Sequence, residues 1–185
     1  MYIDFETFPV LTTRRLVLRQ IAITDAVQLH NIRSNPEVNK YVDRPPSTGI
    51  ADAEAFIQKI TNLVNNNESI YWVITTKESD VLIGTVCLWN FDIENQTIEI
   101  GYELLPDHQG KGIMAEAVAE VIKYGFEVIQ ARIITAFPSA NNDRSVSLLE
   151  KFNFTIDSGE YVNTHGDVDG MLVYVLKRKA SNIEH

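Results

Sequence analysis

Residues Asp107–Glu120 read DHQGKGIMAEAVAE, and this stretch carries the most information about the fold. A strand-like apolar run ends just before it, and an alanine-rich, helix-like run begins inside it. Gly110 and Gly112 flank Lys111 where the two runs meet. A turn alone would need only one of these glycines, so the pair indicates that something approaches the backbone closely at this corner.

The chemistry of a helix start suggests what approaches. The first helical turn leaves several backbone N–H groups unpaired, and the helix dipole makes that end locally positive. Gly110 and Gly112 have no β-carbon, so a diphosphate could reach those N–H groups, and Lys111 adds a positive charge. A strand–turn–helix corner that needs glycine only for its dihedral angles is the alternative explanation at this point.

Two other phosphate-binding motifs do not fit. Gly110, Gly112 and Ala115 match the dinucleotide pattern G-x-G-x-x-A, but that pattern belongs to a βαβ unit with parallel strands. Here the preceding strand closes an antiparallel meander, and the next one ends in TAFPSA, without the expected acid. A nucleoside-triphosphate loop is excluded because no Gly-Lys-Ser/Thr follows four spacer residues.

Composition indicates one globular domain over residues 1–185, since 45% of its 185 residues are hydrophobic. Cys87 is the single cysteine, which excludes an internal disulfide and favours a reducing, cytoplasmic compartment. The N-terminus resembles no secretory signal, and no apolar run is long enough for a membrane span. The net charge of −9 predicts no nucleic-acid partner and weakly favours cationic partners such as amines, although it also serves solubility.

Hydrophobic periodicity predicts a mixed α/β sheet in the order β-α-α-β-β-β-α-β-α-β-β. The short turns between the second, third and fourth predicted strands predict an antiparallel meander, and the helical connection after it predicts a parallel neighbour. The predicted strands are Arg15–Gln20, Ser69–Thr76, Val81–Phe91, Gln96–Leu105, Arg132–Phe137, Phe154–Val162 and Met171–Arg178. The predicted helices are Thr24–Ser34, one from Ser47 or Thr48 to Val64, Gly112 to about Val128, and Asp143–Phe152.

Three separated stretches resemble the GNAT N-acetyltransferase superfamily, in its ribosomal-protein-alanine (RimJ/RimL-like) branch. LTTRRLVLRQI resembles the opening strand Thr-x-Arg-Leu-x-Leu-Arg, and IEIGYELLPDHQGKGIMAEA resembles the acetyl-CoA strand with its pyrophosphate loop. NDRSVSLLEKFNF is similar to the Asn-x-x-Ser helix and the turn after it. With the matching order of elements, the resemblance covers roughly residues 10 to 178, and the middle motif is the most specific.

Two positions depart from the branch pattern. Met114 stands where the last small residue of the loop is expected, which makes phosphate access depend more on Gly110 and Gly112. Asn153 replaces the usual glycine of the late turn, and asparagine tolerates a positive φ better than most residues. We therefore expect the turn to survive.

The resemblance implies acetyl transfer from acetyl-CoA to an amine by direct attack, without an acetyl-enzyme and without a metal. It places the pantetheine arm beside Glu103, Leu104 and Leu105, with a backbone N–H near Glu103 on the thioester carbonyl. The pyrophosphate would be held by the loop and the first helical turn, which comprise Gln109, Gly110, Lys111, Gly112, Ile113, Met114 and Ala115.

An attacking amine must be neutral, so a general base is useful. Strand alternation puts Glu99, Gly101 and Glu103 on one face of their strand. Glu99 lies ten residues before Gln109, a spacing at which acetyltransferases of this type often place a base. We rank Glu99 first and Glu103 second; the alternative is that both are ordinary solvent-facing carboxylates.

The thiolate leaving group needs a proton, and by resemblance Ser145 is the donor while Asn142 contacts the pantetheine arm. The alternative for both is helix capping, because Asn142 or Asp143 is a good N-cap residue. Cys87 is expected to pack rather than react, since no histidine accompanies it in sequence.

The expected acceptor is a primary amine, either the N-terminal α-amine of a protein or a small amine. The alternatives are a small-molecule or antibiotic acetyltransferase and a non-catalytic acyl-CoA-binding module. Arg33, Tyr41 and Trp89 could line an acceptor pocket, and the loops 33–49 and 163–170 would shape it. The resemblance leaves a monomer and a homodimer both open.

Overall fold

The computed structural model describes residues 1–159 and 171–179 and contains one eight-stranded mixed sheet. The strands lie side by side in the order β1-β2-β3-β4-β5-β6-β8-β7. Their bounds are β1 Leu11–Thr12, β2 Leu16–Gln20, β3 Ile70–Thr76, β4 Ser79–Asp92, β5 Thr97–Leu104, β6 Ile133–Ala136, β7 Thr155–Ile156 and β8 Tyr174–Lys177.

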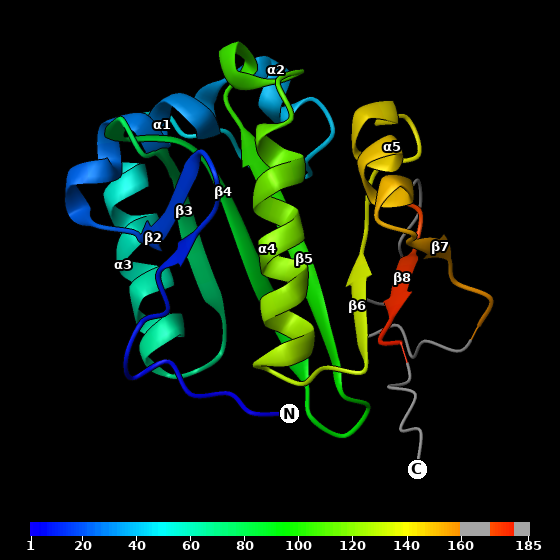
Figure 1. Cartoon of the computed structure of the whole chain (residues 1–185). Coiled ribbons are helices and arrows are strands. Elements are labelled where there is room, and N and C mark those ends of the chain that lie inside the picture. Colours follow the sequence, from blue (N-terminus) through cyan, green and yellow to red (C-terminus); the bar gives the residue numbers. More distant parts are fainter. Residues whose placement is uncertain (160–170, 180–185) are drawn as a thin grey trace.

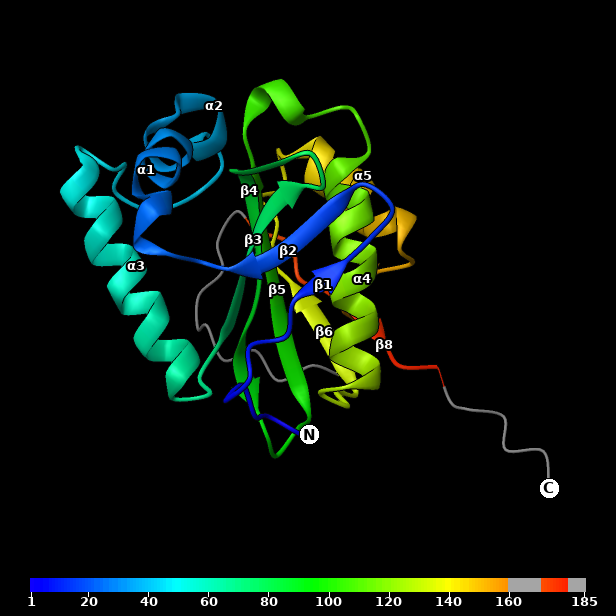
Figure 2. The same ribbon diagram turned by 60° about the vertical axis from the view of Figure 1, so that its left-hand side comes forward.

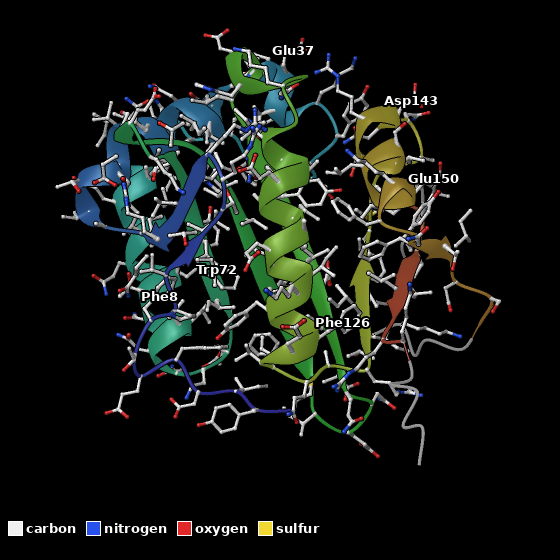
Figure 3. All side chains as sticks on the ribbon, viewed as in Figure 1. Phe8, Glu37, Trp72, Phe126, Asp143 and Glu150 are labelled. Atoms are coloured by element: carbon white, nitrogen blue, oxygen red, sulfur yellow. The ribbon has the colours of Figure 1, made fainter. Side chains whose placement is uncertain are left out.

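Helices cover both faces of this sheet (Figures 1 and 2). The helices α1 (Ala26–Ser34) and α3 (Ile50–Asn65) pack on one face, and α4 (Ile113–Glu127) packs on the other. The short helix α2 (Pro36–Asn39) follows α1, and α5 (Asp143–Lys151) follows β6. Figure 3 shows Asp143 and Glu150 near the two ends of α5. Single turns of 3₁₀ helix, η1 (Ile23–Asp25) and η2 (Pro106–His108), precede α1 and α4.

The predicted fold class and the order of the main elements are confirmed. Strands β3, β4 and β5 form the antiparallel meander, and β6 pairs in parallel with β5 after the α4 crossover. The structure adds β1, α2 and two 3₁₀ turns. The second long helix begins at Ile50 with Gly49 as its N-cap, rather than at Ser47 or Thr48.

The C-terminal strands are shorter than predicted. The strand expected over Phe154–Val162 is only Thr155–Ile156, and Gly159 has a φ of 95°, which ends extended pairing. Residues 160–162 of that prediction, and the loop 163–170, lie outside the described residues. The turn before β7 behaves as expected, because Asn153 takes a φ of 63°. Asparagine adopts this left-handed conformation at low cost.

The sheet separates between β5 and β6. These strands pair only at Thr97, Ile98 and Glu99 of β5, whereas β5 stays paired with β4 as far as Leu104. Beyond Glu99, no strand in the described residues pairs with this edge of β5, which we call the open edge. Figure 1 shows β5 and β6 diverging toward the end of the molecule that carries α5.

The core between β3 and α4 is built around Trp72, which is fully buried. Its ring meets Tyr124 of α4 and Phe8 of the N-terminal segment edge-on, at centroid distances of 5.4 and 6.2 Å. The indole N–H donates to the carbonyl of Pro9 at 2.8 Å, so the polar edge of the ring is satisfied. This packing ties the N-terminal segment to the sheet.

A second tie joins the start of the chain to the start of α4. Glu116, in the first turn of α4, accepts a hydrogen bond from the Thr13 hydroxyl at 2.5 Å and from the Arg15 backbone N–H at 2.8 Å. The Arg15 side chain also pairs with the Glu116 carboxylate at 2.6 Å and donates to the Lys111 carbonyl at 3.0 Å. Burial opposes ionisation, but the bonds from Thr13 and Arg15 outweigh it and lower the pKa of Glu116 to about 2.

None of the helices within residues 1–159 and 171–179 is long and apolar enough to cross a membrane.

The low pKa of Glu116 predicts a pH-dependent contribution to stability. Its folded pKa of about 2 lies below the ordinary 4.5, so the contribution is full above pH 4.5 and disappears as pH falls toward 2. Glu116→Gln should therefore lower the free energy of unfolding by about 2 kcal/mol at pH 7 and by less at pH 3. Urea denaturation at both pH values measures this.

Glu54→Gln on the exposed side of α3 is the matched control and should change little at either pH. An equal loss for Glu116→Gln at both pH values would show that its charge does not contribute.

Candidate active site

The corner before α4 has the geometry that the glycine pair predicted. Gly110 and Gly112 have φ angles of 73° and 74°, and Gly112 is the N-cap of α4. A β-carbon built on Gly110 would meet nothing within 4 Å, so the space outside this backbone is open. The corner thus requires glycine dihedrals, and it also leaves room for a group against the helix N-terminus, so the binding of a diphosphate there stays a prediction.

The side chains of the other loop residues are engaged within the protein, so the loop exposes mainly backbone at the corner. The Gln109 amide donates to the Leu104 carbonyl at 2.9 Å, and its oxygen accepts from Arg144 of α5. The Lys111 ammonium donates to the Asp107 carbonyl at 2.7 Å and so closes its own loop. Three further residues of the predicted pyrophosphate loop lie in the first turn of α4. Ile113 is buried in the core, and Met114 and Ala115 are half-buried.

Hydrogen bonds show which backbone groups of β5 face the open edge. Leu105 donates its N–H to Ile83 beside β4, whereas the Thr135 hydroxyl reaches the Ile98 carbonyl from the β6 side at 3.2 Å. Because direction alternates along a strand, the outward groups beyond Glu99 belong to Ile100, Tyr102 and Leu104. An N–H near Glu103 that faces the open edge is therefore that of Tyr102 or Leu104, whereas the N–H of Glu103 itself faces β4.

A cavity of about 460 Å³ lies against the α3 face of the sheet and reaches the open edge of β5. Its floor comes from β3, β4 and β5, one wall comes from α3 and the segment around Arg33 and Arg44, and the other comes from the residues after β6. The two predicted bases and the predicted proton donor line it, as do Arg33, Tyr41, Trp89 and Asn142. Sequence elements far apart thus converge on one space.

Glu99 is buried in the floor of the cavity, with 6% of its surface exposed. It pairs across the ladder with Trp89 of β4, and the Asn90 amide lies 3.4 Å from its carboxylate. A carboxylate that is buried yet faces a cavity is suited to accept a proton from a bound molecule. The alternative of an ordinary solvent-facing carboxylate does not fit this burial.

Glu103 shares the face of Glu99 but has a different partner. One of its carboxylate oxygens forms an ion pair with Arg44, and the other is buried without a hydrogen-bond partner among the described residues. Arg44 is held in turn by two bonds from its guanidinium to the Asn39 side chain, at 2.8 and 3.1 Å. Because this ion pair occupies the Glu103 carboxylate, Glu103 is the poorer candidate for the base.

A hydroxyl pair bridges β5 and α5 at the open edge. The Tyr102 and Ser145 hydroxyls lie 2.7 Å apart, and both residues line the cavity. Burial raises the pKa of Tyr102 to about 12, against a smaller lowering by the bond with Ser145, so the phenol keeps its proton at neutral pH. Asn142 is the N-cap of α5, and its side chain accepts from the Ser145 N–H at 3.2 Å, as the capping alternative predicted.

Cys87 sits on the same floor but is not a nucleophile. Burial, with smaller effects from the charges of Glu103 and Glu99, raises the pKa of its thiol to about 12, so the thiol is neutral. Within the described residues, no group of three histidine, cysteine or acidic side chains could hold a metal ion.

The sequence did not identify Tyr102 or Arg44 as site residues. Alternation placed Tyr102 on the apolar face, and only its need for a hydrogen-bond partner when buried could have indicated a polar role. Arg44 lies in the irregular stretch between α2 and α3, where no periodicity fixes a direction. Thr13 and Arg15 belong to the opening motif, but their contact with Glu116 spans about 100 residues of chain and leaves no local pattern.

Comparisons with known proteins agree with this geometry. Residues 15–155 match the family model of the acetyltransferase (GNAT) domain. The N-acetyltransferase p20 of Bacillus licheniformis is 36% identical over 172 residues, which cover 91% of this chain and 97% of that protein.

Two solved structures share the fold at lower identity. The ribosomal-protein-S5-alanine acetyltransferase of Vibrio fischeri is 22% identical with a TM-score of 0.76, covering 91% of this chain and 96% of its own. The spermidine N-acetyltransferase of Vibrio cholerae, solved with CoA and spermine, is 21% identical with a TM-score of 0.74 over 89% of this chain and 96% of its own.

The family match spans most of the chain, and the curated relative matches nearly end to end. The predictions of an acetyl-CoA-dependent N-acetyltransferase and of its fold are thereby confirmed at the level of the family. This protein belongs to the GNAT acetyltransferase family.

Proposed function

We propose that this enzyme acetylates a primary amine bound in the cavity on the α3 face of the sheet. The observation that carries the proposal is the position of Glu99, a buried carboxylate in the floor of a cavity that reaches the open edge of β5. The amine would lie between this carboxylate and the hydroxyl pair Tyr102–Ser145. The first candidate acceptor is a protein N-terminal α-amine, and a small amine is the alternative.

The described residues fit acetyl-CoA as the acetyl donor. The open space at Gly110 and the N-terminal N–H groups of α4 suit a diphosphate. The outward backbone groups of Tyr102 and Leu104 suit the amides of a pantetheine arm, which would pair like an added strand. The Leu104 carbonyl already accepts a hydrogen bond from the Gln109 side chain. On cofactor binding, this side chain would either move away or share the carbonyl with the pantetheine amide. When bound, acetyl-CoA supplies the activated acetyl thioester.

The proposed chemistry is direct attack of the amine on the thioester carbon. Glu99 takes the proton of the amine, directly or through water, because most amines are protonated at neutral pH. The outward N–H of Tyr102 or Leu104 donates to the carbonyl oxygen as its charge develops. Ser145 protonates the departing thiolate, its hydroxyl regains a proton from Tyr102 through the 2.7 Å contact, and water reprotonates the phenol.

Three further expectations accompany this proposal. We place the enzyme in the cytoplasm, which is supported by its single cysteine and by its requirement for acetyl-CoA. We expect one catalytic domain over residues 1–185. A monomer and a homodimer are both open, and sedimentation at several protein concentrations distinguishes them.

The proposal is tested by binding and turnover together. Calorimetry should detect acetyl-CoA binding, and release of free thiol should follow on adding one of a panel of primary amines and short peptides with free N-termini. Gly110→Ala should weaken acetyl-CoA binding about tenfold, since its methyl group enters the open space.

Gly159→Ala is the matched control, because Gly159 also has a positive φ and open space around it but lies beyond β7. It should bind acetyl-CoA as the parent does. Tight binding without turnover on any amine would instead support a non-catalytic acyl-CoA-binding module.

The base assignment predicts a change in the pH profile. Glu99→Gln should lower kcat about a hundredfold or more and flatten the rising limb of the rate against pH, because the group that must lose its proton is gone. Glu103→Gln, measured in parallel, should retain that limb, since the ion pair with Arg44 already occupies its carboxylate. An unchanged profile in Glu99→Gln would exclude this role.

The hydroxyl pair predicts non-additive effects. Ser145→Ala and Tyr102→Phe should each lower kcat about tenfold, and the double variant should be no slower than the worse single, because both act on one proton. Rates at saturating acetyl-CoA with a fixed amine measure this. Full turnover in Ser145→Ala would show that the thiolate takes its proton elsewhere.

A further inference from the structure

The cavity contains a positive charge that no described side chain neutralises. Arg33 of α1 lines it half-buried, with its guanidinium centre 3.8 Å from the centroid of the Phe56 ring. Its backbone carbonyl is fixed by the Ser47 N–H at 3.0 Å and the Asn39 amide at 2.7 Å. Among the described residues, its side-chain N–H groups have no hydrogen-bond acceptor and no ion pair.

The neighbouring charges do not supply a partner. Glu103 forms an ion pair with Arg44, so the charges of these two side chains neutralise each other. Arg33 is left beside a second guanidinium. Burial, then repulsion from Arg44, lowers the pKa of Arg33, and the attraction of Glu103 only partly offsets this. Arginine nevertheless keeps its charge in proteins. A partly desolvated guanidinium whose N–H groups find no acceptor among the described residues is favourably placed to bind an anion.

The charge of the cavity opposes that of the whole molecule. Of the described lining residues, three are basic, Arg33, Arg44 and Lys59, and two are acidic, Glu99 and Glu103, although the chain carries a net charge of −9. A polyamine would find more basic than acidic side chains here. A molecule with an amine at one end and an anion at the other would place the amine toward Glu99 and the anion toward Arg33.

We propose that the acceptor is an amine that also carries an oxyanion, a carboxylate or a phosphate, and that Arg33 binds this anion. The inference rests on the proposed function, because it assumes that the cavity holds the acceptor. It narrows the substrate class to amino acids, acidic peptides, amino sugars bearing acids and similar molecules. Phe56 contributes by keeping the guanidinium plane in place through its ring.

The test compares amines that carry an anion with a neutral amide of similar size. Glycyl-glutamate amide, glycyl-glutamine amide and glycyl-phosphoserine amide form one series, and 4-aminobutyrate, 4-aminobutanamide and 3-aminopropyl phosphate form another. Each is titrated by calorimetry into enzyme saturated with CoA, which has no acetyl group to transfer. At least one carboxylate or phosphate amine should bind about tenfold or more tightly than the neutral amide of its series.

Variants then identify the residue responsible. Arg33→Met keeps an apolar stem over Phe56 and should remove the preference, and Arg33→Lys should restore part of it. Arg132→Met, an exposed arginine at the start of β6, is the matched control and should retain the preference. Unchanged CoA affinity in all three variants shows that they are folded.

Turnover with acetyl-CoA separates the two proposals. If the anionic amines bind better through Arg33 but none is acetylated, the proposed function fails and the anion site stands. If amines are acetylated while no carboxylate or phosphate amine binds more tightly than its amide, or Arg33→Met keeps the preference, the anion site is overturned. A preference for the carboxylate or for the phosphate in either series identifies which oxyanion Arg33 selects.

Discussion

The end of β5–β6 pairing at Glu99 is the constraint on which the rest of the site depends. A strand inside a sheet has both edges bonded, and here one edge of β5 loses its partner while the other keeps it. The Leu104 carbonyl accepts from the Gln109 side chain, and the other backbone groups of this edge are available to water or to a bound molecule. Most of the proposed functional groups lie close to this edge, since the glycine corner follows β5, the hydroxyl pair joins β5 to α5, and the cavity reaches the same place.

The charged groups around this edge divide into two kinds. Some are paired within the fold and hold it in shape, as Glu116 holds Thr13 and Arg15, and Arg44 holds Glu103. Arg33 is of the other kind, because it faces the cavity and has no such pair among the described residues. Buried charges are costly unless paired, so a charge that the fold leaves unneutralised is a better indicator of a ligand than one it satisfies.

Local patterns predicted the sheet, the main helices and the glycine corner, because periodicity and turn chemistry act over a few residues. They also placed Glu99, Gly101 and Glu103 on one face, and all three line the cavity. They could not separate the two carboxylates, whose difference comes from Arg44, some 59 residues away. Tyr102 was missed for the same reason, because its partner Ser145 lies on another element. The strand at β7 was predicted too long, because a short pairing at the edge of a sheet leaves only a weak sequence signal for its length.

The narrow join between the two parts of the sheet has a thermodynamic consequence. Only three residue pairs link β5 to β6, and with β6 come α5, β8 and β7. A ligand that spans the gap would bind the native chain and not the unfolded one, and would add RT ln(1 + [L]/Kd) to the free energy of unfolding. Resistance to heat and to proteases would then rise and fall with the supply of acetyl donor, which makes the lifetime of the protein a gauge of the metabolic state around it.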